Sequence, residues 1–153
     1  MKCYEITFSP TGGTQKAADL LTRELSGEYT AVDLTERDAD FSAAAFAAGD
    51  LAVIAVPSYG GRVPAAAVER LGTLKGNGVR AVLVCVYGNR AYEDTLAELE
   101  DAAVQAGFRV IAAVAAIAEH SVIRRYAAGR CMHGLLPTTS PALSPSPSLG
   151  RGL

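Results

Sequence analysis

The stretch Ser9-Pro10-Thr11-Gly12-Gly13-Thr14 decides the fold, because it joins an extended segment to a helical one. Apolar side chains alternate with other residues before it, in residues 2–8, which is typical of a strand. Residues 14–26 after it carry apolar side chains at helical spacing. A loop at such a junction places several backbone N–H groups at a helix N-terminus, where they can bind a phosphate dianion. The sequence therefore predicts a phosphate site at residues 9–14.

The residue types in this loop limit what it can do with a phosphate. Three hydroxyls and two glycines supply neutral donors and close backbone approach, and the loop has no lysine or arginine. Such a site suits one phosphate held for binding rather than a triphosphate being cleaved. Gly13 is followed by Thr14-Gln15-Lys16-Ala17, so this is not a Walker A loop, and no G-x-G-x-x-G follows the first strand.

Composition narrows the class of protein. The chain has 153 residues, of which 50% are hydrophobic, so we expect one domain with a proper core. A net charge of −2 gives no electrostatic case for nucleic acid. The N-terminus lacks the apolar core of a signal peptide, and no stretch is long and apolar enough for a membrane span, so the cytoplasm is the expected location.

The three cysteines, Cys3, Cys85 and Cys131, lie far apart in the sequence. Their spacing excludes an iron–sulfur or zinc site built from neighbouring cysteines, and two histidines do not make a metal site. Cys3 and Cys85 lie in apolar strand-like segments, which predicts buried, reduced thiols.

Strand patterns and helix patterns alternate along the chain. Strands are predicted at residues 3–8, 29–34, 51–56, 79–86 and 108–115, and helices at 14–26, 41–48, 64–71 and 91–106. This alternation predicts a doubly wound, five-stranded parallel sheet in a three-layer α/β/α arrangement. Residues 118–128 are read as a loop with one or two helical turns, so a convincing final helix over the sheet is missing.

Three loops are expected to meet at one edge of this sheet. The loops after strands one, three and four begin at Ser9, Pro57 and Tyr87, and the carboxyl ends of parallel strands share an edge. The second loop offers Tyr59 beside two glycines, and the third begins Tyr87-Gly88-Asn89-Arg90. Tyrosine faces can stack on a flat ring, and glycines let backbone groups reach ring heteroatoms. The combination predicts a flat heteroaromatic ligand with a phosphate tail.

With these loops in place, the chain resembles the flavodoxins, and more narrowly the flavodoxin half of the fused flavodoxin–ferredoxin proteins called ferrodoxins. The matching stretches are residues 9–14, Pro57-Ser58-Tyr59-Gly60-Gly61-Arg62-Val63-Pro64, Val86-Tyr87-Gly88-Asn89-Arg90-Ala91-Tyr92 and Ala118-Glu119-His120-Ser121. The resemblance covers about residues 2–130. It implies the strand order 2-1-3-4-5 and FMN as the cofactor.

The resemblance also implies a role for each loop. The hydroxyls of Ser9, Thr11 and Thr14 and the N–H groups of Gly12, Gly13 and Thr14 would hold the FMN phosphate. Ser58, Tyr59, Gly60 and Gly61 would flank one side of the ring, with Tyr59 stacking on it. Tyr87, Gly88, Asn89 and Arg90 would contact its pyrimidine edge through their backbone. No side chain is implied to act as acid, base or nucleophile, because the flavin carries the chemistry.

Two arginines distinguish this chain from strongly acidic flavodoxins. Arg62 and Arg90 lie in the two ring loops, where a nearby cation would favour an anionic reduced flavin and make its potential less negative. The alternatives are that they are solvated charges, or that Arg62 meets an acidic partner. The acidic residues of the helix at 91–106, Glu98 among them, are read as a solvated face or as a docking face for a basic partner.

The last segment, residues 131–153, changes abruptly to proline and serine without periodicity or acidic residues. Its composition predicts disorder and puts the domain boundary near residue 130. The cysteine-rich ferredoxin half of the fused proteins is missing. We therefore expect a truncated or frame-shifted reading frame near Cys131, or a fragment, with some apolar surface exposed where a last helix would lie.

The sequence thus favours an FMN-binding electron carrier whose redox partner is a ferredoxin or an iron–sulfur enzyme. One alternative is an FMN-dependent NAD(P)H or quinone reductase, which would need a substrate pocket over the ring. The other is a remnant that no longer binds flavin because of its C-terminus.

Overall fold

The computed structural model describes residues 1–41, 44–88 and 94–117. The predictions for residues 118–128, for the tail at 131–153, and for Asn89 and Arg90 lie outside the described residues. The elements are β1 (Cys3–Thr7), α1 (Gly13–Leu25), β2 (Thr30–Asp33), β3 (Leu51–Pro57), α2 (Ala65–Leu71), β4 (Arg80–Tyr87), α3 (Thr95–Gln105) and β5 (Arg109–Ile117).

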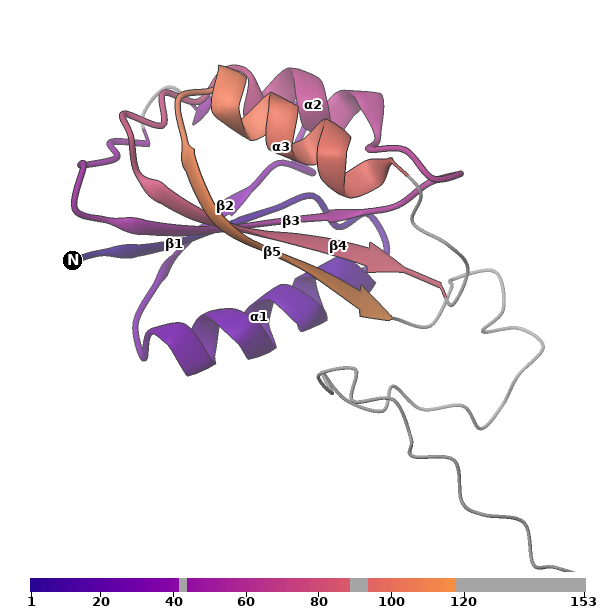
Figure 1. The fold of residues 1–153 in the computed structure, drawn as a ribbon, viewed down its shortest axis with the longest axis horizontal. Coiled ribbons are helices and arrows are strands. Elements are labelled where there is room, and N and C mark those ends of the chain that lie inside the picture. The colour runs from indigo at the N-terminus through magenta and orange to yellow at the C-terminus, as the bar shows by residue number, and fades with distance from the viewer. Residues whose placement is uncertain (42–43, 89–93, 118–153) are drawn as a thin grey trace, which may run out of the picture.

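The five strands form one parallel sheet in the order β2-β1-β3-β4-β5. Helix α1 lies on one face of this sheet, and α2 and α3 lie together on the other (Figure 1). The strand order reverses between β1 and β3, because β2 pairs with the outer edge of β1. The predicted three-layer, doubly wound fold is confirmed, and the reversal point is where such sheets bind ligands.

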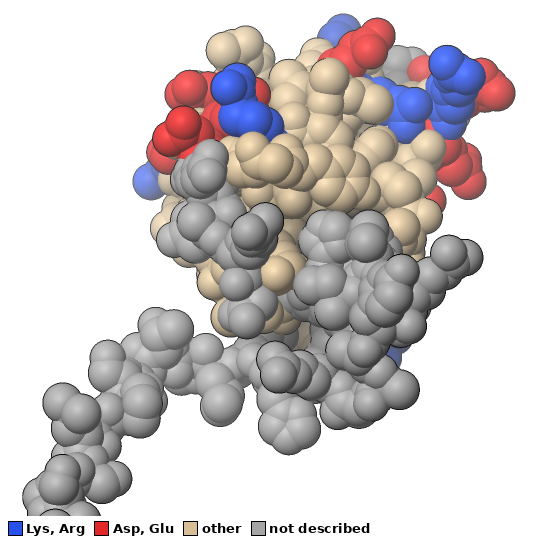
Figure 2. Space-filling view, turned by 90° about the vertical axis from the view of Figure 1, so that its right-hand side faces the viewer, with Lys and Arg blue, Asp and Glu red and all other residues tan. Residues whose placement is uncertain are grey.

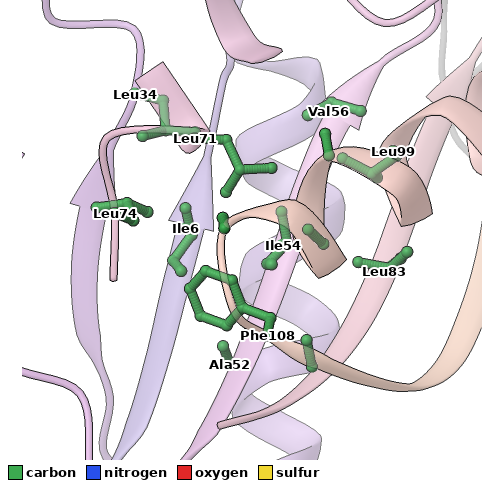
Figure 3. Close-up of a cluster of buried hydrophobic side chains, with 14 of the residues drawn as sticks. Ile6, Leu34, Ala52, Ile54, Val56, Leu71, Leu74, Leu83, Leu99 and Phe108 are labelled. Atoms are coloured by element: carbon green, nitrogen blue, oxygen red, sulfur yellow. The ribbon is translucent and has the colours of Figure 1, made fainter. Parts of the chain in front are cut away.

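The larger core fills the space between the sheet and helices α2 and α3. Ile6, Ile54 and Leu83 project from three neighbouring strands and are completely buried, and Leu71 and Leu99 cover them from the helices (Figure 3). Burying one such side chain stabilises the fold by about 1.5–3 kcal/mol. This core fixes the carboxyl ends of β1, β3 and β4 relative to one another.

A smaller core lies on the other face, under α1. Ala18 of the helix packs on Val53 and Val84 of the central strands. The outer strand is less covered: Ile111 and Ile117 of β5 are 48% and 56% exposed. Apolar side chains are therefore exposed on β5.

The predicted helix at residues 41–48 is wrong for the described residues 44–48, which form no helix. Tertiary contacts use the backbone groups that a helix would need. The Tyr4 hydroxyl donates to the carbonyl of Ala45 at 2.9 Å, and the Ala47 N–H donates to the Asp50 carboxylate at 3.1 Å. Phe46 packs edge-on against Tyr4, with 4.7 Å between ring centroids. These contacts outweigh the helix propensity of the alanines.

Candidate functional site

The loop at residues 9–14 has the geometry of a capped helix N-terminus. Gly12 is the N-cap of α1 with φ +83° and ψ −9°, a left-handed conformation that glycine adopts without a Cβ clash. The Gly12 N–H closes a turn on the carbonyl of Ser9 at 3.3 Å. The hydroxyl of Ser9 accepts the N–H of Gln15 at 2.9 Å and so satisfies one donor of the first helical turn.

The three predicted hydroxyls differ in accessibility. Thr11 is exposed, Ser9 is half-buried, and Thr14 is only 4% exposed. The Ser9 oxygen accepts from Gln15 but keeps its own proton to donate. Gly12 and Gly13 are half-buried beside it. The loop therefore offers neutral donors at the positive end of α1, and this donor set fits a phosphate monoester.

The second loop is a tight turn that presents a tyrosine. Tyr59 and Arg62 exchange two backbone hydrogen bonds, at 2.9 and 3.2 Å, around Gly60 and Gly61. Both glycines have positive φ, +59° and +76°, as a type I′ turn requires. Tyr59 remains 48% exposed at the start of this turn. An exposed ring on a fixed turn is suited to stacking on a flat ligand.

This turn is attached to neighbouring elements by side chains. Ser58 donates its N–H to the carbonyl of Val86 at 2.8 Å, and its hydroxyl lies 2.7 Å from that of the buried Thr95. Arg62 donates to both oxygens of Glu98 at 3.1 Å, and the same carboxylate accepts the N–H of Val63 at 2.9 Å. The Arg62 guanidinium, with the Val63 N–H, lowers the pKa of Glu98. Arg62 is therefore paired within the chain, and Glu98 is not merely solvated.

The third loop begins where β4 ends. Tyr87 and Gly88 are half-buried there, while Asn89 and Arg90 lie outside the described residues. Strands β3 and β4 are neighbours, and Pro57 at the end of β3 pairs with Val86, one residue before the end of β4. The second and third loops therefore begin side by side. The face at the carboxyl ends of the strands has a largely uncharged centre among its described residues, with acidic and basic side chains along its upper border (Figure 2).

The first loop is supported by two residues, Thr35 and Arg70, that the sequence pattern did not single out. The Ser9 N–H donates to the hydroxyl of Thr35 at 2.8 Å. Arg70 of α2 donates to the carbonyls of Leu34 and Thr35 and lies over the Phe8 ring, 5.9 Å from its centroid. An arginine thus lies next to a loop that contains no cation of its own. Arg70 follows the loop in the sequence only after α1, β2 and β3, so no local pattern indicated that it lies beside the loop.

Two further residues under the loop, Glu5 and Gln15, could have been identified from the sequence. Glu5 interrupts the apolar strand β1 and is completely buried, and Gln15 lies in the first turn of α1 and binds it. A charged residue in the middle of a strand that is buried on both faces needs a polar partner. Searching the adjoining helix for that partner would have identified Gln15.

Other features of the described residues do not coincide with this edge. An open groove lies beside β2, lined among others by Tyr4, Val32 and Phe41, and none of the predicted site residues lines it. Within the described ranges, no three histidine, cysteine or acidic side chains gather to hold a metal ion. No helix among these residues is long and apolar enough to cross a bilayer.

Comparison with solved structures finds the same fold in several flavoproteins. A flavoprotein of Lactobacillus acidophilus, solved in complex with FMN, has 11% sequence identity and a TM-score of 0.57 over 74% of this chain and 92% of that chain. A Streptococcus pneumoniae flavodoxin has 23% identity and a TM-score of 0.56 over 79% and 88%. Two-electron-reduced Megasphaera elsdenii flavodoxin has 17% identity and a TM-score of 0.54 over 77% and 88%. No family model and no curated protein sequence matches the chain. At these identities the similarity is one of fold, and the fold of this chain is that of the flavodoxins.

Proposed function

We propose that this chain binds FMN noncovalently at the sheet edge where the loops after β1, β3 and β4 lie. We propose further that it transfers electrons to and from a protein partner. The observation that carries this is the placing of the capped loop at residues 9–14 and the Tyr59 turn on the adjoining strands β1 and β3. The flavodoxin-like fold supports it, and the neutral donors of the loop suit the phosphate of FMN.

FMN supplies the redox chemistry when bound, and the residues of the chain bind and orient it. Ser9 and the N–H groups around Gly12 and Gly13 would hold the phosphate. Tyr59 would cover one face of the ring, and Tyr87 and Gly88 would adjoin its other side. Asn89 and Arg90 stay predictions for that side. The proposed partner is a ferredoxin or an iron–sulfur enzyme, and the proposed location is the cytoplasm.

The decisive experiment is a titration of the purified chain with FMN and with riboflavin, which lacks the phosphate. Ser9→Ala should weaken FMN about tenfold and riboflavin much less, because a lost hydrogen bond to a charged group costs about 1.5–3 kcal/mol. Ser26→Ala, at the other end of α1, is the matched control. A chain that binds neither flavin contradicts the proposal and favours the remnant. Steady turnover of NADPH with a quinone would favour the reductase.

A further inference from the structure

The hydrogen bonding between β1 and β2 changes where the phosphate loop begins, because a side chain takes the place of the backbone there. Thr7 lies opposite Asp33 in the parallel register, and its carbonyl accepts the N–H of Leu34 at 2.7 Å. In a regular parallel ladder the next bond would run from the N–H of Ser9 to the carbonyl of Leu34. The N–H of Ser9 donates instead to the hydroxyl of Thr35 at 2.8 Å. The first residue of the loop is therefore held by a side chain.

The backbone around Thr35 is fixed by two charged groups. The carbonyl of Leu34, which the ladder leaves unused, accepts from the guanidinium of Arg70, and the carbonyl of Thr35 accepts from the same group at 2.9 Å. The N–H of Thr35 donates to the carboxylate of Asp33 at 2.8 Å. Both backbone groups of Thr35 are thus occupied, and the two carbonyls just after β2 accept from a cation. Its hydroxyl is the polar group of Thr35 that remains for a ligand.

Replacing a carbonyl by a hydroxyl changes what this position can do. A carbonyl only accepts hydrogen bonds, whereas a threonine hydroxyl accepts and also donates. The Thr35 hydroxyl accepts the N–H of Ser9, and it donates to no acceptor within residues 1–41, 44–88 and 94–117. Thr35 is half-buried, so its proton can reach a ligand at the surface. The Ser9 hydroxyl also keeps its proton, because its oxygen accepts from Gln15. Two hydroxyl donors therefore adjoin at the start of the loop.

We propose that Thr35 is a fourth hydroxyl of the phosphate site, which holds Ser9 through its N–H and donates its own proton to an oxygen of a phosphate monoester. The loop at residues 9–14 supplies donors from one side, and Thr35 supplies one from the segment after β2. Arg70 adds positive charge behind this hydroxyl, which favours an anionic ligand. Thr35 thereby helps the site to select ligands that carry a phosphate. This inference rests on the proposed FMN binding.

The first test separates a contact to the phosphate from general support of the fold. Dissociation constants for FMN and riboflavin are measured for wild type, Thr35→Val, Thr35→Ser and the control Thr30→Val, at an exposed threonine that begins β2. Thr35→Val keeps the shape of the side chain without the hydroxyl, so it should weaken FMN about tenfold and riboflavin less than about twofold. Thr35→Ser keeps the hydroxyl and should bind FMN within about twofold of wild type. The control should change neither flavin.

The outcomes of this test are distinct. Equal losses for both flavins in Thr35→Val would show a purely structural role, and wild-type FMN affinity would show no role, so either result overturns the inference. A Thr35→Ser variant as weak as Thr35→Val also overturns it. A wild type that binds neither flavin overturns the proposed function, and this inference with it, whereas the other results leave the proposed function standing.

The second test does not depend on Thr35→Val being folded. In Thr35→Asp the carboxylate can still accept the N–H of Ser9, but it cannot donate to a phosphate and it repels one. In 1 M salt the screening length is about 3 Å, so a charge that does not touch the phosphate has little effect. Thr35→Asp should then weaken FMN by about a hundredfold and riboflavin hardly at all, while Thr30→Asp should change neither. Wild-type FMN affinity of Thr35→Asp in 1 M salt, or equal losses of both flavins, would overturn the proposal.

Discussion

The guanidinium of Arg62 makes two hydrogen bonds to the carboxylate of Glu98, Nε to Oε2 and Nη2 to Oε1, both at 3.1 Å. The pair joins the Tyr59 turn to helix α3, and the carboxylate also accepts the N–H of Val63 at 2.9 Å. A cation paired in this way contributes less to the potential at the loop edge than a free one would. The contribution of Arg62 to the expected, less negative flavin potential is therefore smaller than that of an unpaired arginine.

Glu98→Gln should loosen the Tyr59 turn and weaken FMN and riboflavin alike, because it acts on the ring side rather than on the phosphate. Hydrogen bonds from Arg62 and Val63 lower the pKa of Glu98, so its stabilising effect is present above the ordinary value of 4.5 and is lost as pH falls through the lowered pKa. The check is the thermal midpoint from neutral pH downward, with Glu100→Gln on the same helix as control. A variant with the wild-type acid profile would contradict the prediction.

Arg70→Met should destabilise the fold by about 1–3 kcal/mol, because it leaves the carbonyls of Leu34 and Thr35 without their charged donor. Thr35 in turn accepts the N–H of Ser9, so we also expect weaker FMN binding. Urea unfolding measures the first effect and flavin titration the second. Arg109→Met, at an exposed position of β5, is the control and should change neither.

The sequence predicted the features that depend on neighbouring residues, and it missed the contacts between residues far apart in the chain. Strand β3 and the start of α1 after the Gly12-Gly13 loop are local signals, since an apolar run and a glycine-containing helix start depend on neighbouring residues. The alanines at 44–48 resemble a helix locally, yet Tyr4 and Asp50 take their backbone groups. The Arg62–Glu98 and Arg70–Thr35 contacts join residues 36 and 35 positions apart, which no local pattern reports.

Cys3 and Cys85 should be unreactive in the folded protein. Both are buried and free, and burial raises the pKa of Cys85 to about 11. At about pH 8 only about one Cys85 thiol in a thousand is then the reactive thiolate. In a Cys131→Ser variant, a chromogenic disulfide reagent should detect no rapidly reacting thiol in the native state and two after denaturation. Rapid native reaction would show that one of the two strands opens.

Gly60 should tolerate asparagine and reject valine. Its φ of +59° is a left-handed conformation, and a Cβ added there meets nothing within 4 Å, so any cost is one of backbone strain alone. Asparagine adopts this conformation readily, whereas a β-branched residue pays about 1–2 kcal/mol. Urea unfolding of Gly60→Asn and Gly60→Val measures that difference at one position with similar added volume.

If the strain is relieved by opening the turn, Tyr59 is no longer fixed. Gly60→Val should then also weaken the binding of riboflavin, which reports on the ring without the phosphate. Equal stability of the two variants would mean that the turn does not hold Gly60 at positive φ.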